Sequence, residues 1–315
     1  MALYELYSHP ARRSYRAGLC SKAAFFLLLV TGLTYVPPLL VSFRSHGFWL
    51  KTNVYEEQPS VHFNHEVLFL ALTSSPHDYL TWSTFPTFNQ LQEDNLRVPV
   101  VTSREEDKNQ DGKMDVLYFK LELPLQSTEH ILAVQLILTF SYQLTKMSRF
   151  SMQSMAFLQS SFPIPGSQLY VNGDLKLQQK QPLKYRGIDE RYNGSVINKT
   201  SIFASDYSFQ RIVAEYSERN VTTILANAQP LWLVGRAAEA PFVLNAVIRY
   251  PVENISYYPG FWETIKFAWI QYVSILLIFI WIFERIKIFV FQNQMVTTVP
   301  AMKVYSVESC KEHIS

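Results

Sequence analysis

Charged residues are scarce in this chain of 315 residues, because Asp, Glu, Lys and Arg make up only 17% of it. Soluble domains usually carry roughly 25%. The net charge of +2 is too small for the basic face that nucleic acids require, so we expect no nucleic-acid partner. Aromatic residues reach 15%. Little charge together with many rings indicates that part of the chain lies in an apolar solvent.

Glycine and cysteine are scarce as well. The 10 glycines include no closely spaced group of the kind that cradles phosphate. The two cysteines, Cys20 and Cys310, exclude a disulfide framework and a cysteine-based zinc site. Cys20 lies beside a long apolar run, a position where S-palmitoylation occurs, although an unmodified thiol is the simpler interpretation.

Two apolar runs predict membrane-spanning helices at 23–43 and 265–283. The first has 21 residues without a charge, and at about 1.5 Å per residue it would cross a hydrocarbon core of about 30 Å. In the second, the 17 residues from Phe267 to Phe283 carry no charge. Tryptophan and tyrosine near its ends would form an aromatic belt. The alternative, a buried core helix, would usually keep a polar stripe.

The charges that flank the first run predict its orientation. Residues 1–22 have a net charge of +3 and residues 44–66 a net charge of −1, so the N-terminus should be cytoplasmic. No cleavage-site pattern follows the run, which favours an uncleaved signal anchor over a signal peptide. The expected order is a cytoplasmic tail at 1–22, an extracytoplasmic domain at 44–264, and a second cytoplasmic tail at 284–315.

Four N-x-[ST] sequons occur, all inside the expected extracytoplasmic domain. They begin at Asn193, Asn198, Asn220 and Asn254. Glycans are added to exposed sequons in the secretory pathway, so this placement independently supports the topology. We therefore predict a glycosylated domain.

The pattern of the central domain is mostly of period two, which is typical of strands with one buried face. Alternation is clear at 133–144 and 242–250, and 61–72 and 116–123 also predict strands. Residues 169–177 predict a hairpin over an Asn172-Gly173 turn. A helix is expected at 209–219. Together these predict two transmembrane helices flanking an antiparallel β-sandwich-like ectodomain with a short inserted helix.

One acidic loop has the spacing of a calcium site. Asp107, Asn109, Asp111 and Asp115 offer oxygen ligands at alternate positions, and Gly112 permits a sharp turn. Calcium prefers such flexible oxygen cages. An EF-hand would require Glu where Tyr118 stands, so the loop is closer to the calcium-binding β-hairpin loops of integrin-type repeats. An acidic turn without an ion is the alternative.

No pattern indicates an enzyme. His62 and His65 lie three apart on a predicted strand, where they would point to opposite faces, and no third zinc ligand is near. The chain has no G-x-S-x-G motif. The expected spans carry no ionisable residue near their centres, which argues against proton relay and ion coupling.

Six segments of the chain carry a resemblance to a known family, namely Met1–Leu6, Ser14–Ala23, Arg104–Met114, Leu121–His130, Tyr170–Asp174 and Phe283–Asn293. Through them nearly the whole chain resembles the transmembrane protein 231 family. The resemblance implies a non-enzymatic subunit of the tectonic-like complex, also called the Meckel syndrome module, in the membrane of the ciliary transition zone. There it would form a diffusion barrier between ciliary and plasma membranes and support ciliogenesis and Hedgehog signalling.

The same resemblance implies the partners and the modified residues. The partners are tectonic proteins, meckelin, B9-domain proteins and other transition-zone membrane subunits, with glycans at Asn193, Asn198 and Asn220. Two other classes share the expected topology, namely two-span ion-channel subunits and accessory subunits of lipid flippases. Trimeric channels of this topology usually have disulfide-rich ectodomains, whereas this one has no cysteine.

Overall fold

The computed structural model describes residues 14–45, 48–74 and 79–301, which form two units. One unit contains the two long helices with their adjoining ends, and the other runs from Lys51 to Gly260. The predicted tails lie partly outside the described residues, as does Cys310. The domain limits of 44 and 264 stay predictions beside the structural unit 51–260.

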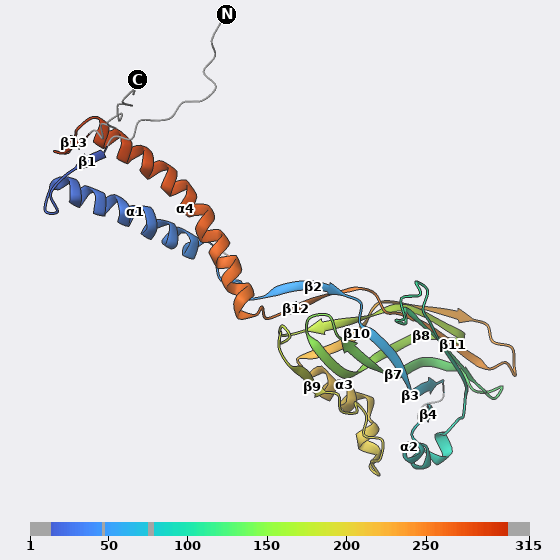
Figure 1. Ribbon diagram of the computed structural model, residues 1–315. Coiled ribbons are helices and arrows are strands. Elements are labelled where there is room, and N and C mark those ends of the chain that lie inside the picture. Colours follow the sequence, from blue (N-terminus) through green and yellow to red (C-terminus); the bar gives the residue numbers. More distant parts are fainter. Residues whose placement is uncertain (1–13, 46–47, 75–78, 302–315) are drawn as a thin grey trace, which may run out of the picture. The chain divides into compact units, whose positions relative to one another are not determined.

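The helical unit contains α1 (Lys22–Arg44) and α4 (Phe261–Gln292). Ser21 caps α1 by accepting a hydrogen bond from the Ala24 amide at 3.3 Å. The strands β1 (Ser14–Arg16) and β13 (Val299–Ala301) pair antiparallel next to the helices. Phe26 of α1 meets Phe291 of α4 edge to face, with 6.1 Å between ring centroids. The start of α1 therefore lies beside the end of α4 (Figure 1).

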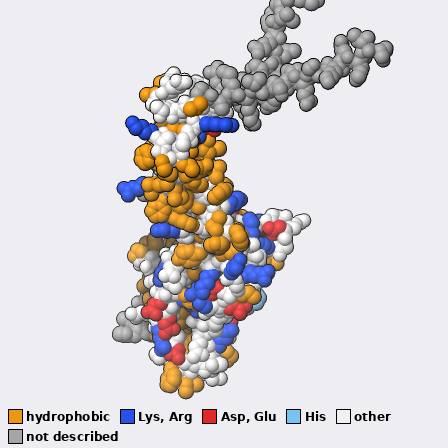
Figure 2. Space-filling view, turned by 60° about the vertical axis from the view of Figure 1, so that its left-hand side comes forward, with side chains coloured by type: hydrophobic (Ala, Val, Ile, Leu, Met, Phe, Trp, Pro, Cys, Tyr) orange, Lys and Arg blue, Asp and Glu red, His pale blue; other side chains and the backbone are white. Residues whose placement is uncertain are grey.

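Most apolar side chains of these helices face outward. Leu28 is 70% exposed in α1 and Leu277 is 62% exposed in α4, and Figure 2 shows the resulting stretch of hydrophobic surface. Within the described part of the chain, α1 is the helix whose length and hydropathy suffice to cross a membrane. The first predicted span thus coincides with a suitable helix. The second lies inside α4, and its membrane crossing stays a prediction.

The second unit is built on a nine-stranded sheet. Its order is β4-β3-β7-β8-β11-β6-β5, and β9 and β10 also pair with β8. The strand bounds are β3 (Ser60–Thr73), β4 (Tyr79–Ser83), β5 (Val100–Glu106), β6 (Val116–Leu123), β7 (Ile131–Leu144), β8 (Arg149–Gln179), β9 (Ile188–Tyr192), β10 (Val221–Val234) and β11 (Phe242–Arg249). The four segments predicted to be strands, 61–72, 116–123, 133–144 and 242–250, each correspond to one of these strands.

The 31-residue strand β8 belongs to two halves of the sheet (Figure 1). Its residues 150–161 pair with β7, and its residues 166–179 pair with β10 and, over 168–174, with β11. The two halves face each other across the core, because Phe63 of β3 meets Phe119 of β6 at 6.1 Å between ring centroids. This arrangement is sandwich-like, as predicted. It is not wholly antiparallel, because β11 and β9 both run parallel to β8.

The predicted hairpin at 169–177 is wrong. Asn172 and Gly173 lie in the middle of β8, where they pair with Val247 and Ile248 of β11. The role of Gly173 is close packing, since a Cβ built on it would stand 3.0 Å from the Leu225 side chain. A glycine inside a strand commonly marks such an approach.

A helical layer covers one outer face of the sheet. It consists of α2 (Pro86–Leu91), η1 (Glu93–Asn95), η2 (Ala204–Tyr207) and α3 (Phe209–Ser217). The inserted helix α3 was predicted, whereas α2 was not. Ile212 and Tyr216 of α3 pack with Leu68, Ile137 and Met155 of the sheet in a second apolar cluster. Strand β7 is therefore buried on both faces, and not on one as its alternation predicts.

The strands β2 (Asn53–Glu57) and β12 (Glu253–Tyr257) form a separate antiparallel ribbon. Tyr55, Ile255 and Tyr257 of the ribbon belong to the main core. In the sequence, β12 ends four residues before α4 begins. The ribbon is thus the part of the domain nearest in sequence to the long helices.

Candidate functional site

The two neighbouring sequons lie in one loop, here called the sequon loop (193–203), between β9 and η2. Beneath it, β3 contains a bulge, because Phe63 pairs with Phe140 while Val67 pairs with Leu138. The polar residues Asn64, His65 and Glu66 fill this bulge, and His65 has a φ of 59°. Bulges re-aim side chains. This one brings Glu66 beside Thr139 of β7.

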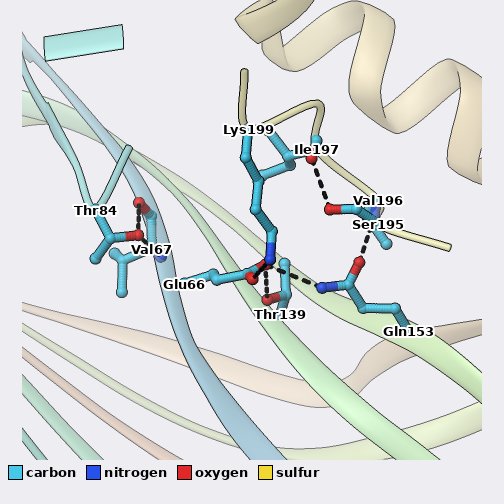
Figure 3. Close-up of polar contacts among 9 residues, drawn as sticks. All are labelled: Glu66, Val67, Thr84, Thr139, Gln153, Ser195, Val196, Ile197 and Lys199. Carbon is cyan, nitrogen blue, oxygen red and sulfur yellow. Dashed lines mark hydrogen bonds and ion pairs between the residues drawn. The ribbon is translucent and has the colours of Figure 1, made fainter. Parts of the chain in front are cut away.

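Glu66 is the centre of a polar network under the sequon loop (Figure 3). Its carboxylate accepts hydrogen bonds from Thr139 Oγ1 at 2.8 Å and from Gln153 Nε2 at 2.9 Å. It also forms an ion pair with Lys199, the middle residue of the sequon at Asn198. The Glu66 side chain is 13% exposed, so its two hydrogen bonds are shielded from water, whereas the Lys199 side chain is 49% exposed.

Further contacts hold the loop on the sheet. Gln153 Oε1 accepts a hydrogen bond from the Val196 amide at 2.5 Å. Ile197 is 1% exposed in the second apolar cluster, and Thr87 of α2 donates to the Lys199 carbonyl at 3.1 Å. The sequon loop is therefore anchored by its backbone, a charged side chain and one apolar side chain.

The anchored loop presents Asn193 and Asn198 at the surface, where both are exposed. The Asn198 side-chain oxygen accepts hydrogen bonds from the Thr200 backbone and hydroxyl, each at 3.3 Å. The sequon is thus folded into a compact turn. This exposure suits both asparagines to glycosylation.

The other two sequons are separate from this loop and from each other. Asn220 is half-buried, and its amide donates to the Tyr192 hydroxyl at 3.2 Å. Thr222, which completes that sequon, is 5% exposed in β10. Asn254 is exposed on β12, opposite Glu56 of β2. The four predicted sites thus fall into two exposed loop positions, one half-buried strand start and one ribbon position.

The acidic loop 107–115 joins β5 to β6 as a hairpin connection. Asp107 accepts hydrogen bonds from the amides of Gln110 at 2.7 Å and Gly112 at 2.9 Å. Asp111 accepts from the Lys113 amide at 2.8 Å and from the Asn109 side chain at 3.2 Å. Gly112 has a φ of 85°, as the sharp turn requires. The carboxylates therefore stabilise the loop by accepting hydrogen bonds from its own amides.

Asp115 closes this loop. It accepts hydrogen bonds from the amides of Lys108 and Asn109 and, at 2.7 Å, from Gln58 Nε2. Burial alone would raise the pKa of Asp115, but these donors hold it below its ordinary value. Among the described residues, no group of three or more His, Cys, Asp or Glu stands ready to hold a metal ion. Calcium binding by Asp107, Asn109, Asp111 and Asp115 stays a prediction.

The two histidines of β3 do not form a ligand pair. His62 and His65 are both exposed, and the bulge between them breaks the strand alternation. His62 Nδ1 lies 3.8 Å from Glu105, and His65 Nδ1 lies 3.4 Å from the Ser103 hydroxyl. Each therefore has its own polar neighbour on β5.

Two features of the domain are absent from the sequence-based expectations. Glu57 and Glu253 are 5% and 8% exposed, respectively. The second feature is a pair of exposed apolar side chains at alternate positions of β10, here called the β10 patch. It consists of Leu231 and Leu233.

Comparison with known proteins gives a consistent result over the full chain. A family model described as Transmembrane protein 231 matches residues 1–300. Curated proteins with this name are 74% identical in Bos taurus, 74% identical in Mus musculus and 71% identical in Homo sapiens, each over 100% of both chains. No solved structure matches this chain.

Proposed function

Because this chain belongs to the transmembrane protein 231 family, we propose that it is a non-enzymatic transmembrane subunit of the tectonic-like complex at the ciliary transition zone. In this role it helps to form the diffusion barrier between ciliary and plasma membranes, and it is needed for ciliogenesis and Hedgehog signalling. The observation that carries the proposal is the full-length family match. The family is named for a transmembrane protein and not for an enzyme activity.

The proposed topology has two spans, with both tails cytoplasmic and the strand-rich domain extracellular. α1 supplies the first span. α4 supplies the second, supported by its 17-residue charge-free stretch and by outward-facing side chains such as Trp281, which is 63% exposed. The exposed sequons at Asn193 and Asn198 agree with a domain that passes through the secretory pathway.

The proposed partners are tectonic proteins, meckelin, B9-domain proteins and other transition-zone membrane subunits, together with the lipid bilayer. A diffusion barrier needs membrane-anchored subunits that associate laterally. A membrane anchor, a rigid strand-rich domain and the exposed β10 patch supply parts suited to that task.

The test is imaging and affinity purification of the endogenous protein tagged at its C-terminus in ciliated cells. We expect a ring between the basal body and the axoneme by super-resolution microscopy, and co-purification of transition-zone subunits. A diffuse plasma-membrane signal, with a P-type ATPase as the main partner, would favour a flippase accessory subunit. A reproducible conductance in reconstituted membranes would favour an ion-channel subunit. Either result would overturn the proposal.

A further inference from the structure

Two buried glutamates face each other in the β2–β12 ribbon. Glu57 of β2 and Glu253 of β12 are direct cross-strand partners in the antiparallel register. Side chains at directly opposed positions lie on the same face, with Cβ atoms about 5 Å apart. Glu57 is 5% exposed and Glu253 is 8% exposed. Like charges at such positions destabilise a sheet, and burial increases the effect.

The hydrogen bonds of the pair leave one oxygen without a partner. Glu253 accepts from the Leu177 amide at 2.5 Å and from the Tyr142 hydroxyl at 3.3 Å. Glu57 Oε1 accepts from the amides of Thr145 at 2.8 Å and Lys146 at 2.9 Å. Glu57 Oε2 is fully buried and has no hydrogen-bond partner within the described part of the chain. A proton on Glu253 would leave a single negative charge in this buried pair.

The surrounding groups do not neutralise two negative charges. On the same ribbon, Tyr55 and Tyr257 are buried neutral side chains and Glu56 is exposed. Tyr142 of β7 is buried, and its pKa is raised by burial and by Glu253. Lys146 directs its ammonium group to the Glu56 carbonyl. Among the described residues no Lys, Arg or His forms an ion pair with Glu57 or Glu253, although Lys176 of β8 exerts some attraction on Glu253.

We propose that Glu253, buried directly opposite Glu57, takes up a proton and that this proton fastens the β2–β12 ribbon. With the proton in place, one carboxyl group is neutral and the cross-strand repulsion disappears. Without it, two buried carboxylates oppose each other and the ribbon opens more readily. The ribbon is therefore a pH-sensitive element, firmer in acidic than in neutral surroundings.

The direction of the pH dependence follows from the proton balance. Burial raises the pKa of Glu253 from 4.5 to about 7, although its hydrogen bonds and Lys176 act in the opposite direction. The closed ribbon thus binds a proton that the open ribbon releases between about pH 4.5 and pH 7. The stability that this proton gives to the closed ribbon is complete below about pH 4.5. It is lost as the pH rises to about 7, and it changes little above that pH.

The experiment is hydrogen exchange of the full-length protein in nanodiscs, followed by mass spectrometry from pH 5 to pH 8. Protection factors, corrected for intrinsic exchange, are compared for peptides covering 53–57 and 253–257. For one proton, the opening constant of the ribbon should rise up to about tenfold per pH unit between pH 5 and pH 7 and then level off. This measurement requires no variant, so it remains decisive if a substitution impairs folding.

Two variants identify the groups responsible. Glu253→Gln should keep the ribbon equally protected from pH 5 to pH 8, because the amide cannot ionise. Glu56→Gln is the matched control, since Glu56 is the exposed neighbour of Glu57 and should keep the wild-type profile. A profile that is flat in the wild type, or unchanged in Glu253→Gln, would overturn the proposal. The proposal would also be overturned if a cation took the place of the proton. In that case EDTA would lower the protection of the ribbon, and calcium would restore it at constant pH.

Discussion

Lys199, the central residue of the sequon at Asn198, forms an ion pair with Glu66 in the bulge of β3. The two residues are far apart in the sequence, and the pair joins the sequon loop to the sheet. Glu66 also accepts hydrogen bonds from Thr139 and Gln153, which are 0% and 7% exposed. One carboxylate beneath the loop therefore joins the sequon to two buried donors of the sheet.

We predict that Glu66→Ala lowers the free energy of unfolding by about 1–3 kcal/mol, because it leaves the Thr139 and Gln153 donors buried without an acceptor. Glu66→Gln keeps an acceptor and should cost less. The ion pair that it removes involves a half-exposed lysine, and such pairs contribute about 0–1 kcal/mol. Chemical unfolding measures both values, and hydrogen exchange of 193–203 should increase more in Glu66→Ala.

The matched control is Glu106→Ala, which breaks the exposed pair with Arg104. Its effect should stay within about 0.5 kcal/mol. If Glu106→Ala and Glu66→Ala cost the same, the network under the sequon loop does not stabilise the domain.

The sequons should differ in occupancy. We predict glycans at Asn193 and Asn198, and lower occupancy at Asn220, because Asn220 is half-buried, its backbone amide donates to Tyr192, and Thr222 is buried in β10. Glycopeptide mass spectrometry of protein from ciliated cells measures each site. Asn198→Gln and Thr200→Ala should remove the same glycan. A protein that carries no glycan at any site would contradict the extracellular placement of the domain.

The clearest successes of the sequence-based interpretation come from regular patterns. Alternation located β7 and β11, the segments 61–72 and 116–123 located β3 and β6, and the apolar face of 209–219 located α3. These signals depend only on residues close together in the sequence, so contacts between distant segments do not change them. The Asn172-Gly173 hairpin failed because a turn signal competes with strand pairing, and here pairing on both sides of β8 prevails.

Other features depend on contacts between distant segments. The second buried face of β7 exists because α3 covers it, and the parallel pairing of β11 with β8 depends on the connection between them. The bulge that directs Glu66 had a visible signal, namely the polar run Asn64-His65-Glu66 inside an apolar strand. The opposition of Glu57 and Glu253, which lie 196 positions apart in the numbering, had none, because it depends on the register of β2 and β12.

Gly166 should tolerate no side chain. A Cβ at this position would lie 2.2 Å from Trp232 Cε3, and Trp232 is held by a hydrogen bond from Nε1 to Ser160 at 2.7 Å. We predict that Gly166→Ala lowers the free energy of unfolding by about 1–3 kcal/mol through overpacking. Gly194→Ala is the control, because no atom lies within 4 Å of its added Cβ and the sequon at Asn193 is kept. Equal unfolding midpoints in both variants would show that Trp232 moves aside freely.

The acidic loop predicts a calcium response. If calcium recruits the carboxylates of Asp107 and Asp111 from their amide partners, millimolar calcium should raise the thermal midpoint of the full-length protein. Magnesium should do so much less, because it dehydrates reluctantly. Asp111→Ala should abolish the calcium response. A wild-type midpoint that is identical in calcium and in EDTA would mean that the loop is a hydrogen-bonded turn only.

The β10 patch should contribute to assembly if the proposed function is right. Leu231 and Leu233 are 60% and 54% exposed on a strand whose described partner is β8 alone, and exposed apolar strands of this kind favour association with other chains. We predict that Leu231→Ser together with Leu233→Ser lowers the recovery of transition-zone subunits several-fold in affinity purification. The thermal midpoint should change little, because neither side chain is buried.

The matched control is Val98→Ser with Val100→Ser, which removes two side chains that are each 64% exposed near or in β5. It should leave the recovery of transition-zone subunits unchanged. The opposite result would place the contact surface at β5.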